Sequence, residues 1–207
     1  QVLADGLLAE GHEVMRASRE PSKLAEWKEK AGPKAQAGTF EQAARWGEQI
    51  VLAVKGAAAE QAVELAGPVN LAGKTVIDAT NPIADAPPVN GVLRFFTNLD
   101  ESLMERLQKK APEAHFVKAF SCVGNPFMIH PKFPGGPPTM FICGSHAGAK
   151  AEVTKLLGSL GWEAADMGSI EAARAIEPLC MLWCIAGLSQ NKWTHARIEL
   201  RKAVQAH

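Results

Sequence analysis

The stretch that decides the fold is Gln1-Val-Leu-Ala-Asp-Gly-Leu-Leu-Ala-Glu-Gly-His-Glu-Val-Met15. Its first half has apolar residues on one helical face, its glycine at position 11 ends that helix, and an apolar strand follows at once. This order is typical of a dinucleotide-binding βαβ unit, in which a first strand and a glycine-rich turn precede the helix and the helix N-terminus holds a pyrophosphate. We therefore expect that first strand and turn, roughly a dozen residues, to be missing upstream of Gln1.

Apolar runs alternate with helical periodicity along the remaining chain, which is the pattern of a parallel sheet covered by helices. The sequence predicts an α/β fold with a Rossmann-like, doubly wound, mostly parallel sheet and a long C-terminal helix over 178–205. Residues 1–207 form one domain in this interpretation. The strands at Val14 and Ile50 should flank the missing first strand, so we expect their facing edges to be unpaired. The expected strands are 13–17, 34–37, 50–54, 75–78, 116–119, 139–143 and 162–166, and the expected earlier helices are 21–30, 40–46, 57–65, 99–109 and 147–160.

The composition argues against several classes of partner. With 22 basic and 22 acidic residues the formal net charge is +0, which gives no field to attract nucleic acid or an anionic membrane. The longest apolar run, 179–188, is about half of what a membrane span needs. Four cysteines lie in or beside apolar runs without zinc-site or disulfide-scaffold spacing, so we expect reduced, buried thiols and a cytoplasmic location.

The turn after the strand at 13–17 carries the sharpest functional signal. An NAD-selective unit places an acid there for the ribose hydroxyl, whereas this chain has Ser18, Arg19 and Lys23 within one turn. A hydroxyl, a guanidinium and an ammonium suit the 2′-phosphate of NADP. The alternative is that the two cations are solvated and Ser18 only caps the following helix.

Two further strand ends predict cofactor contacts. Val54 and Lys55 follow one strand, and Thr80, Asn81 and Pro82 follow the next. The carboxyl ends of parallel strands are where cofactor and substrate meet, and Pro82 would fix the backbone so that the preceding polar side chains face the nicotinamide ribose or ring. An ordinary turn at 80–82 and a solvated Lys55 are the alternatives.

A third strand end predicts the wall of a site for a flat ring. Ala119 and Phe120 end that strand and are expected to contact the cofactor, although Phe120 suits the core equally well. The residues expected to contact a second substrate follow the strand or lie on the closing helix: Ser121, Cys122, Val123, Met181 and Trp183. The apolar run on that helix is too continuous for one face of a surface helix in a monomer. It could be buried against the sheet, line the acceptor pocket or pack with a second copy, and we expect a homodimer.

Stretches along the whole chain resemble the NADP-dependent coenzyme F-420 reductase family, which is related to the cytosolic domain of six-transmembrane metalloreductases. The matching stretches lie in the order of the family: 11–14 with 18–19, 76–82, 117–120, 140–144, 160–162 with 166 and 168, and 171–174 with 177–179. Ser121 departs from the pattern, because members often carry Asn there.

The resemblance implies an NADP-dependent oxidoreductase that passes hydride between NADP(H) and a deazaflavin (coenzyme F-420) or a flavin (FMN or FAD) as the small-molecule acceptor. It requires no catalytic side chain, because the cofactors carry the chemistry. Two rival functions remain open. The chain could be an NADP-binding sensor without turnover, or an imine or hydroxyacid dehydrogenase, for which Lys192 is the candidate proton donor.

Overall fold

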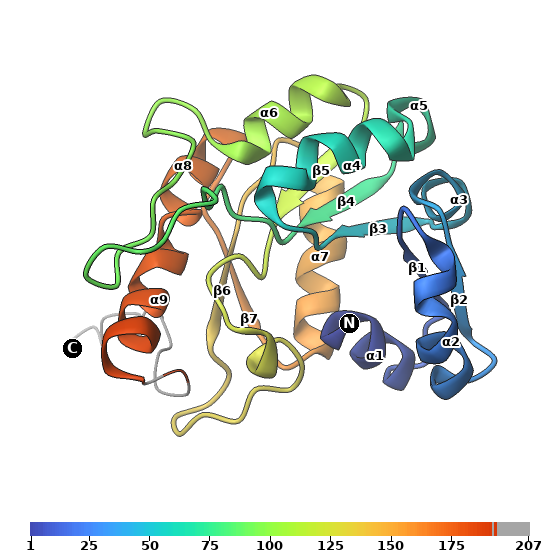
Figure 1. Ribbon diagram of the computed structural model, residues 1–207, viewed down its shortest axis with the longest axis horizontal. Helices are drawn as coiled ribbons and strands as arrows, with labels where there is room; N and C mark the ends of the chain where they lie inside the picture. Colours follow the sequence, from blue (N-terminus) through green and yellow to red (C-terminus); the bar gives the residue numbers. More distant parts are fainter. Residues whose placement is uncertain (192, 194–207) are drawn as a thin grey trace, which may run out of the picture.

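The computed structural model describes residues 1–191 and 193, and it confirms an α/β fold built from parallel strand pairs (Figure 1). The strands are β1 (Val14–Ala17), β2 (Ala35–Gly38), β3 (Gln49–Leu52), β4 (Thr75–Asp78), β5 (His115–Lys118), β6 (Thr139–Ile142) and β7 (Glu163–Asp166). The α-helices are α1 (Val2–Ala9), α2 (Ala25–Ala31), α3 (Phe40–Trp46), α4 (Ala59–Ala66), α5 (Pro68–Leu71), α6 (Leu103–Lys110), α7 (Ala147–Ser159), α8 (Ala173–Ile176) and α9 (Leu179–Gln190). Short 3-10 helices cover Pro21–Leu24, Gly56–Ala58, Asn125–Phe127 and Ile170–Ala172.

The strands form three parallel ladders. β1 pairs with β2, β4 lies between β3 and β5, and β6 pairs with β7. β5 is joined to the β6 end by the N–H of Lys118, which donates to the carbonyl of Cys143 at 2.9 Å. Helices α4 and α6 lie on one side of the β3–β4–β5 ladder and α7 lies on the other (Figure 1), so the apolar strands β4 and β5 are buried on both faces.

The facing edges of β1 and β3 are unpaired, as expected from the sequence. Between them lies a cavity of about 290 Å³. Its lining includes Leu7 of α1, Val14 of β1 and Ile50 of β3, together with Val63 of α4 and Val76 of β4. β1 and β3 therefore each leave the backbone groups of one edge without a ladder partner beside this cavity.

Local capping explains where two of the helices begin. Thr39 and Gln42 form a reciprocal capping box that starts α3 at the predicted residue. The helix predicted from position 99 begins instead at Leu103. The Asn98 side chain accepts hydrogen bonds from the N–H groups of Asp100 and Glu101, which forms a turn, and Ser102 is the cap of α6.

The predicted closing helix is shorter than expected in the part that the structure describes. α9 ends at Gln190, and Asn191 follows with φ +52° in the left-handed region, which stops a helix. A single unbroken helix over 178–205 is therefore wrong at Asn191, and residues 192 and 194–205 lie outside the described residues. The adjacent loop packs on α9, since a Cβ on Gly91 would lie 2.2 Å from Ser189 Oγ.

One helical stretch, Ile170–Ser189, is long and apolar enough to cross a membrane by length and composition alone, with 20 residues and a mean hydropathy of 1.3. Several of its residues are nevertheless buried inside the chain, among them Ala173, Ile176 and Glu177. Glu177 forms an ion pair with Lys118 of the sheet. These contacts are those of a helix packed on its own domain.

Candidate active site

The carboxyl ends of three neighbouring strands form the candidate site. Leu52 of β3, Asp78 of β4 and Lys118 of β5 are paired in register, so residues 53–56, 79–82 and 119–122 leave the same edge of the ladder. The turn after β3 lies directly against the turn after β4, because a Cβ on Gly56 would be only 1.8 Å from the carbonyl oxygen of Asn81. Only glycine fits that close backbone approach. The structure thus brings together the three strand ends at which the sequence predicted cofactor and acceptor contacts.

Beneath this edge lies a buried ionic cluster that sequence reasoning missed. Lys118 Nζ is 2.6 Å from Asp78 Oδ2 and 2.8 Å from Glu177 Oε1, and the side chains of Lys118 and Asp78 are fully buried. The Glu177 carboxylate also accepts the N–H groups of Leu103 and Met104, at the positive end of α6. A charged residue within each apolar run, at Asp78 and Lys118, was the available sequence signal.

The charge state of Lys118 follows from its surroundings. Burial is the largest single influence and alone would lower the pKa of Lys118, but the charges and hydrogen bonds of Asp78 and Glu177 together raise that pKa above its usual value. Lys118 is therefore a fixed cation that ties β4 and β5 to the segment between α8 and α9.

Thr80, a predicted cofactor contact, has its polar groups engaged in this buried cluster. It is 1% exposed, and its hydroxyl donates to Asp78 Oδ1 at 2.6 Å. Its N–H donates to the same oxygen at 2.9 Å, and its carbonyl accepts from Lys118 Nζ at 3.0 Å. With these groups engaged inside the edge, Thr80 positions the turn that carries Asn81.

Asn81 is half-buried at the edge and joins two strand ends. Its Nδ2 donates to the carbonyl of Ser121 at 2.6 Å, whereas its Oδ1 is buried without a partner. Pro82 behind it is buried. A buried carbonyl without a partner is unfavourable by about 1–3 kcal/mol, so this oxygen is an available acceptor for a ligand.

Ala119 and Phe120 have side chains in the core, and their contact with the cofactor stays a prediction that only their backbone groups could meet in this conformation. Ala119 is fully buried and Phe120 is 2% exposed. Phe120 has φ +62°, a strained conformation for a bulky residue, and its N–H donates to Met140 Sδ at 3.1 Å. This turn reverses the chain so that Ser121 and the following residues lie along the edge.

The predicted acceptor wall is partly assembled. Ser121 is 3% exposed, Cys122 is buried, and Val123, Met181 and Trp183 are half-buried. Trp183 of α9 packs on this segment, because a Cβ on Gly124 would lie 2.3 Å from its ring. Ser121 Oγ and Trp183 Nε1 are both buried without hydrogen-bond partners among the described residues.

Cys122 and Cys143, the cysteines nearest this edge in sequence, are not activated nucleophiles. All four cysteines are buried, as predicted, and none is in a disulfide among the described residues. Burial raises the pKa of Cys122 to about 11 and that of Cys143 to about 12, so both are neutral thiols near pH 7. Within residues 1–191 and 193, no group of three His, Cys, Asp or Glu side chains could hold a metal ion.

The turn after β1 has a different character. The Arg19 side chain is exposed and forms no hydrogen bond or ion pair with any described residue, while Ser18 Oγ accepts the N–H of Glu20 at 3.1 Å. Lys23 is paired with Glu20 at 2.8 Å, with both side chains mostly exposed. One cation of the predicted 2′-phosphate site is therefore free, and the other is held by a neighbouring acid.

Comparison with known proteins fits this arrangement. Residues 1–82 match the family described as NADP oxidoreductase, coenzyme F420-dependent. The crystal structure of a candidate F-420-dependent NADP reductase from Arthrobacter sp. FB24 is 32% identical with a TM-score of 0.85, and the match covers 92% of this chain and 89% of that one. The chain belongs to the family of coenzyme F-420-dependent NADP oxidoreductases.

Other matches are more distant. A hypothetical protein of Sinorhizobium meliloti is 25% identical with a TM-score of 0.69, over 83% of this chain and 80% of that one. An imine reductase of Streptomyces aurantiacus is 16% identical with a TM-score of 0.63, over 88% of this chain and 56% of that one, and shares the fold alone. A comparison with curated proteins gave no match.

As a member of this family the chain is an NADP-dependent oxidoreductase, and its residues fit the cofactor class. The unpaired guanidinium of Arg19 suits a phosphate, and the glycine at position 56 lets the turns after β3 and β4 pack closely at the sheet edge. Val54 is half-buried next to Lys55, which is exposed and has no side-chain partner among the described residues. Both remain predicted cofactor contacts.

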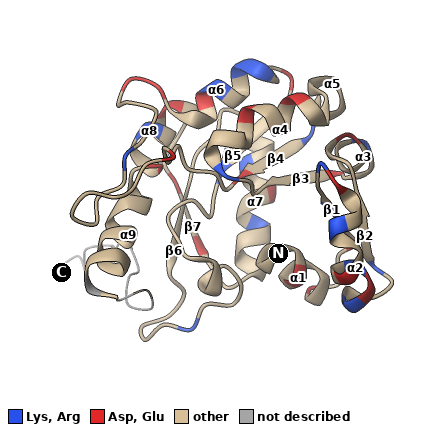
Figure 2. Cartoon of the chain, in the orientation of Figure 1, with Lys and Arg blue, Asp and Glu red and all other residues tan. Residues whose placement is uncertain are grey.

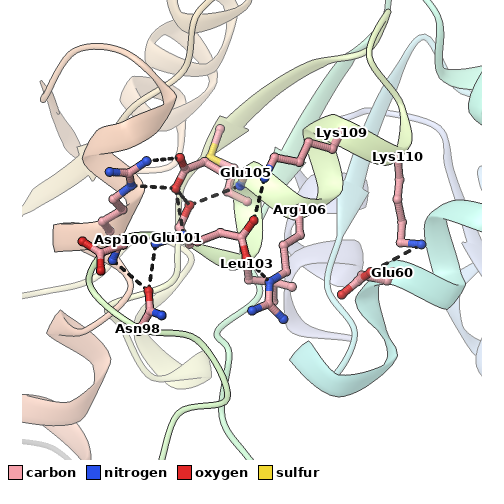
Figure 3. A network of polar contacts seen from close by, with 12 residues as sticks. Glu60, Asn98, Asp100, Glu101, Leu103, Glu105, Arg106, Lys109 and Lys110 are labelled. Atoms are coloured by element: carbon pink, nitrogen blue, oxygen red, sulfur yellow. Dashed lines mark hydrogen bonds and ion pairs between the residues drawn. The ribbon is translucent and has the colours of Figure 1, made fainter.

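A second polar network stabilises the frame of this oxidoreductase away from the edge. Figure 3 shows Glu101 between Arg106 and Lys109, with Asn98 capping the turn before α6. Arg174 of α8 binds Glu105 of α6 through two hydrogen bonds of 2.6 and 2.9 Å, and this contact lowers the pKa of Glu105 to about 2. The network fixes α6, whose first turn is capped by Glu177.

Proposed function

We propose that this chain catalyses hydride transfer between NADP(H) and a deazaflavin or flavin ring. The observation that carries the proposal is the carboxyl edge of β3–β4–β5. There the backbone at Gly56 packs against Asn81, and Asn81 is hydrogen-bonded to Ser121. The buried charges beneath this edge, Lys118 with Asp78 and Glu177, are paired. Such an edge can position two rings, but it offers no buried acid or base that is free. Positioning is what direct hydride transfer requires from a protein.

The cofactor contacts in this proposal come from two places. Arg19 and Ser18 bind the 2′-phosphate of NADP(H) at the turn after β1, with Lys23 contributing once it leaves Glu20. Val54, Lys55 and Asn81 contact the nicotinamide end at the sheet edge. NADPH supplies a hydride from C4 of its ring, and the acceptor takes that hydride on its central ring and one proton from water.

The acceptor lies against the segment after β5 in this proposal. Ser121, Cys122 and Val123 form one wall, and Met181 and Trp183 of α9 form another. The Trp183 ring already contacts Gly124 on that segment. A flat ring held there would lie beside the turn of Asn81, because Asn81 is bonded to Ser121.

We also propose a cytoplasmic homodimer that acts on a small molecule, with neither nucleic acid nor a membrane as partner. Its support is the surface of α9, which carries no charged residue (Figure 2). Leu182 on α9 is 60% exposed, and Val89 on the loop packed beside that helix is 71% exposed. A second copy would cover this apolar surface. Sedimentation at micromolar concentration tests it, and a monodisperse monomer contradicts it.

The test of activity is NADPH oxidation with a panel of acceptors: coenzyme F-420, FMN, FAD, ferricyanide and a cyclic imine. We expect turnover with F-420 or a flavin and a preference for NADPH over NADH. Tight NADPH binding without turnover on any acceptor would identify a sensor. Turnover restricted to the imine would identify a reductase of another substrate class, for which Lys192, outside the described residues, is the first residue to replace.

A further inference from the structure

Three buried polar atoms in the described chain have no hydrogen-bond partner: Asn81 Oδ1, Ser121 Oγ and Trp183 Nε1. They come from three different segments, the turn after β4, the turn after β5 and helix α9. Buried polar atoms in folded proteins nearly always have partners, and those that lack one call for an explanation. Ser121 and Trp183 belong to the proposed acceptor wall, and Asn81, which is proposed to contact the nicotinamide end, is hydrogen-bonded to Ser121.

Direct contacts link the three segments. The Asn81 Nδ2 bond to the Ser121 carbonyl fixes the orientation of the carboxamide, so its Oδ1 is the free end. Ser121 is three residues from Gly124, and a Cβ on Gly124 would lie 2.3 Å from Trp183 Cζ2 and 3.1 Å from Cε2. Because Cε2 carries Nε1, the N–H side of the indole lies against the same segment as Ser121.

The hydrogen-bonding character of these atoms is specific. An indole N–H can only donate, a carboxamide oxygen can only accept, and a hydroxyl can do either. With the hydroxyl donating, the set is two donors and one acceptor. This is the complement of an imide edge, in which an N–H stands between two carbonyl groups.

We propose that Asn81 Oδ1, Ser121 Oγ and Trp183 Nε1 bind the imide edge of the acceptor ring and select acceptors that have one. Flavins and deazaflavins share this edge, whereas a nicotinamide carboxamide and an imine lack it. The inference rests on the proposed function and adds which atoms determine its specificity. The three atoms are covered at present, so binding requires the Trp183 ring to move off Gly124.

The experiment uses riboflavin and N3-methylriboflavin, which differ only at the imide N–H. Binding to the intact protein is measured by flavin fluorescence, and kcat/KM is measured with NADPH as donor. We expect the unmodified flavin to bind about tenfold more tightly than the methylated one, because methylation removes the proton that Asn81 Oδ1 accepts. Equal binding of the two flavins would overturn the proposal.

Two variants test the donors. Trp183→Phe keeps the ring and removes the N–H, and Ser121→Ala removes the hydroxyl; each should weaken riboflavin binding by about tenfold and leave the Kd for NADPH within about twofold. Trp46→Phe on α3 is the matched control and should change neither value. Weakened NADPH binding with unchanged riboflavin binding would assign the atoms to the nicotinamide and overturn the proposal.

The same measurements separate this inference from the proposed function. Riboflavin binding that depends on the imide N–H and on both variants, without any turnover, would support the binding site and reject the hydride-transfer activity. If riboflavin is turned over at a rate that neither N3-methylation nor either variant changes, the activity is supported and the site is rejected. Absence of both binding and turnover with riboflavin and with F-420 would reject both.

Discussion

The two polar regions of this molecule, the turn after β1 and the buried edge of β4 and β5, use their charges in opposite ways. At the turn, Arg19 is exposed with no partner in the described chain, and the Lys23–Glu20 pair lies in solvent. At the edge, Lys118, Asp78 and Glu177 are buried, and Lys118 Nζ lies 2.6 Å from the Asp78 carboxylate and 2.8 Å from the Glu177 carboxylate.

This difference indicates that the turn after β1 binds a ligand, whereas the buried edge holds the strands in position. A free, exposed guanidinium keeps its hydrogen bonds to water and can exchange them for a phosphate at little cost in reorganisation. A buried cation with two carboxylate partners cannot leave them without exposing an uncompensated charge to the interior. We therefore expect variants at the turn to change cofactor affinity and variants at the edge to change stability.

The largest effect is expected for Lys118→Met. Removing this cation leaves two buried carboxylates without compensation, so the free energy of unfolding should fall by about 3–5 kcal/mol. Urea denaturation followed by circular dichroism measures the change. Lys30→Met, which removes an exposed pair with Glu26, is the control and should change stability by less than about 1 kcal/mol. Equal effects of the two variants would show that the buried cluster contributes no more than a surface pair.

Arg19→Ala should act on affinity alone. We expect NADPH binding to weaken by about 1.5–3 kcal/mol, the range for a hydrogen bond to a charged group, which corresponds to roughly 10- to 150-fold in Kd. NADH binding and the free energy of unfolding should hardly change, because the side chain has no partner in the described chain. Titration with both cofactors measures this, and equal losses for the two would contradict a 2′-phosphate contact.

The sequence predicted the strands and the turns of this edge better than the side chains within them. The apolar runs of the strands and the turn residues that follow them place Thr80, Asn81 and Phe120 at strand ends. They do not reveal which of these side chains face inward, because that depends on partners far away in the sequence. Phe120 turns into the core through a positive φ, and Thr80 is engaged by Asp78.

The ionic cluster was missed for the same reason. Lys118 pairs with Asp78, 40 residues away, and with Glu177, 59 residues away along the chain. No local pattern joins three such positions. The unpaired edges of β1 and β3 could be predicted, because strand order in this fold class follows a topological rule that does not depend on individual side chains.

An intermediate effect is expected at Glu105, whose contacts lie between the two extremes. The hydrogen bonds from Arg174 lower the pKa of Glu105 to about 2, so its ionised form stabilises the fold above the unfolded pKa near 4.5, and this contribution is lost as the pH falls toward 2. Glu105→Gln should lower the free energy of unfolding at pH 7 by about 1 kcal/mol, since the guanidinium is 37% exposed and water screens the pair.

The same variant should lose less stability than the wild type between pH 4.5 and pH 2, because one titrating carboxylate is gone. Urea unfolding at pH 7, 4.5 and 2.5 measures this convergence. Glu26→Gln, on an exposed helical face, is the matched control. Parallel pH profiles for wild type and Glu105→Gln would contradict the assigned shift.

The smallest effect, and the one that sharpens the comparison most, is expected at Lys23 and Glu20. Lys23 Nζ lies 2.8 Å from Glu20 Oε1 with both side chains more than 60% exposed, so the pair contributes little to stability. A 2′-phosphate would have to draw Lys23 away from Glu20 and would lie near that carboxylate. Lys23→Ala should therefore weaken NADPH binding by less than about threefold, whereas Glu20→Gln should strengthen it by about two- to threefold by releasing Lys23 and removing a negative charge.

Titration with NADPH in 50 mM and 300 mM salt measures both changes, and each should shrink at the higher salt because these exposed charges are screened. A loss of affinity in Glu20→Gln would mean that the acid orients the phosphate site, and the turn after β1 would then resemble the buried edge in depending on a fixed pair.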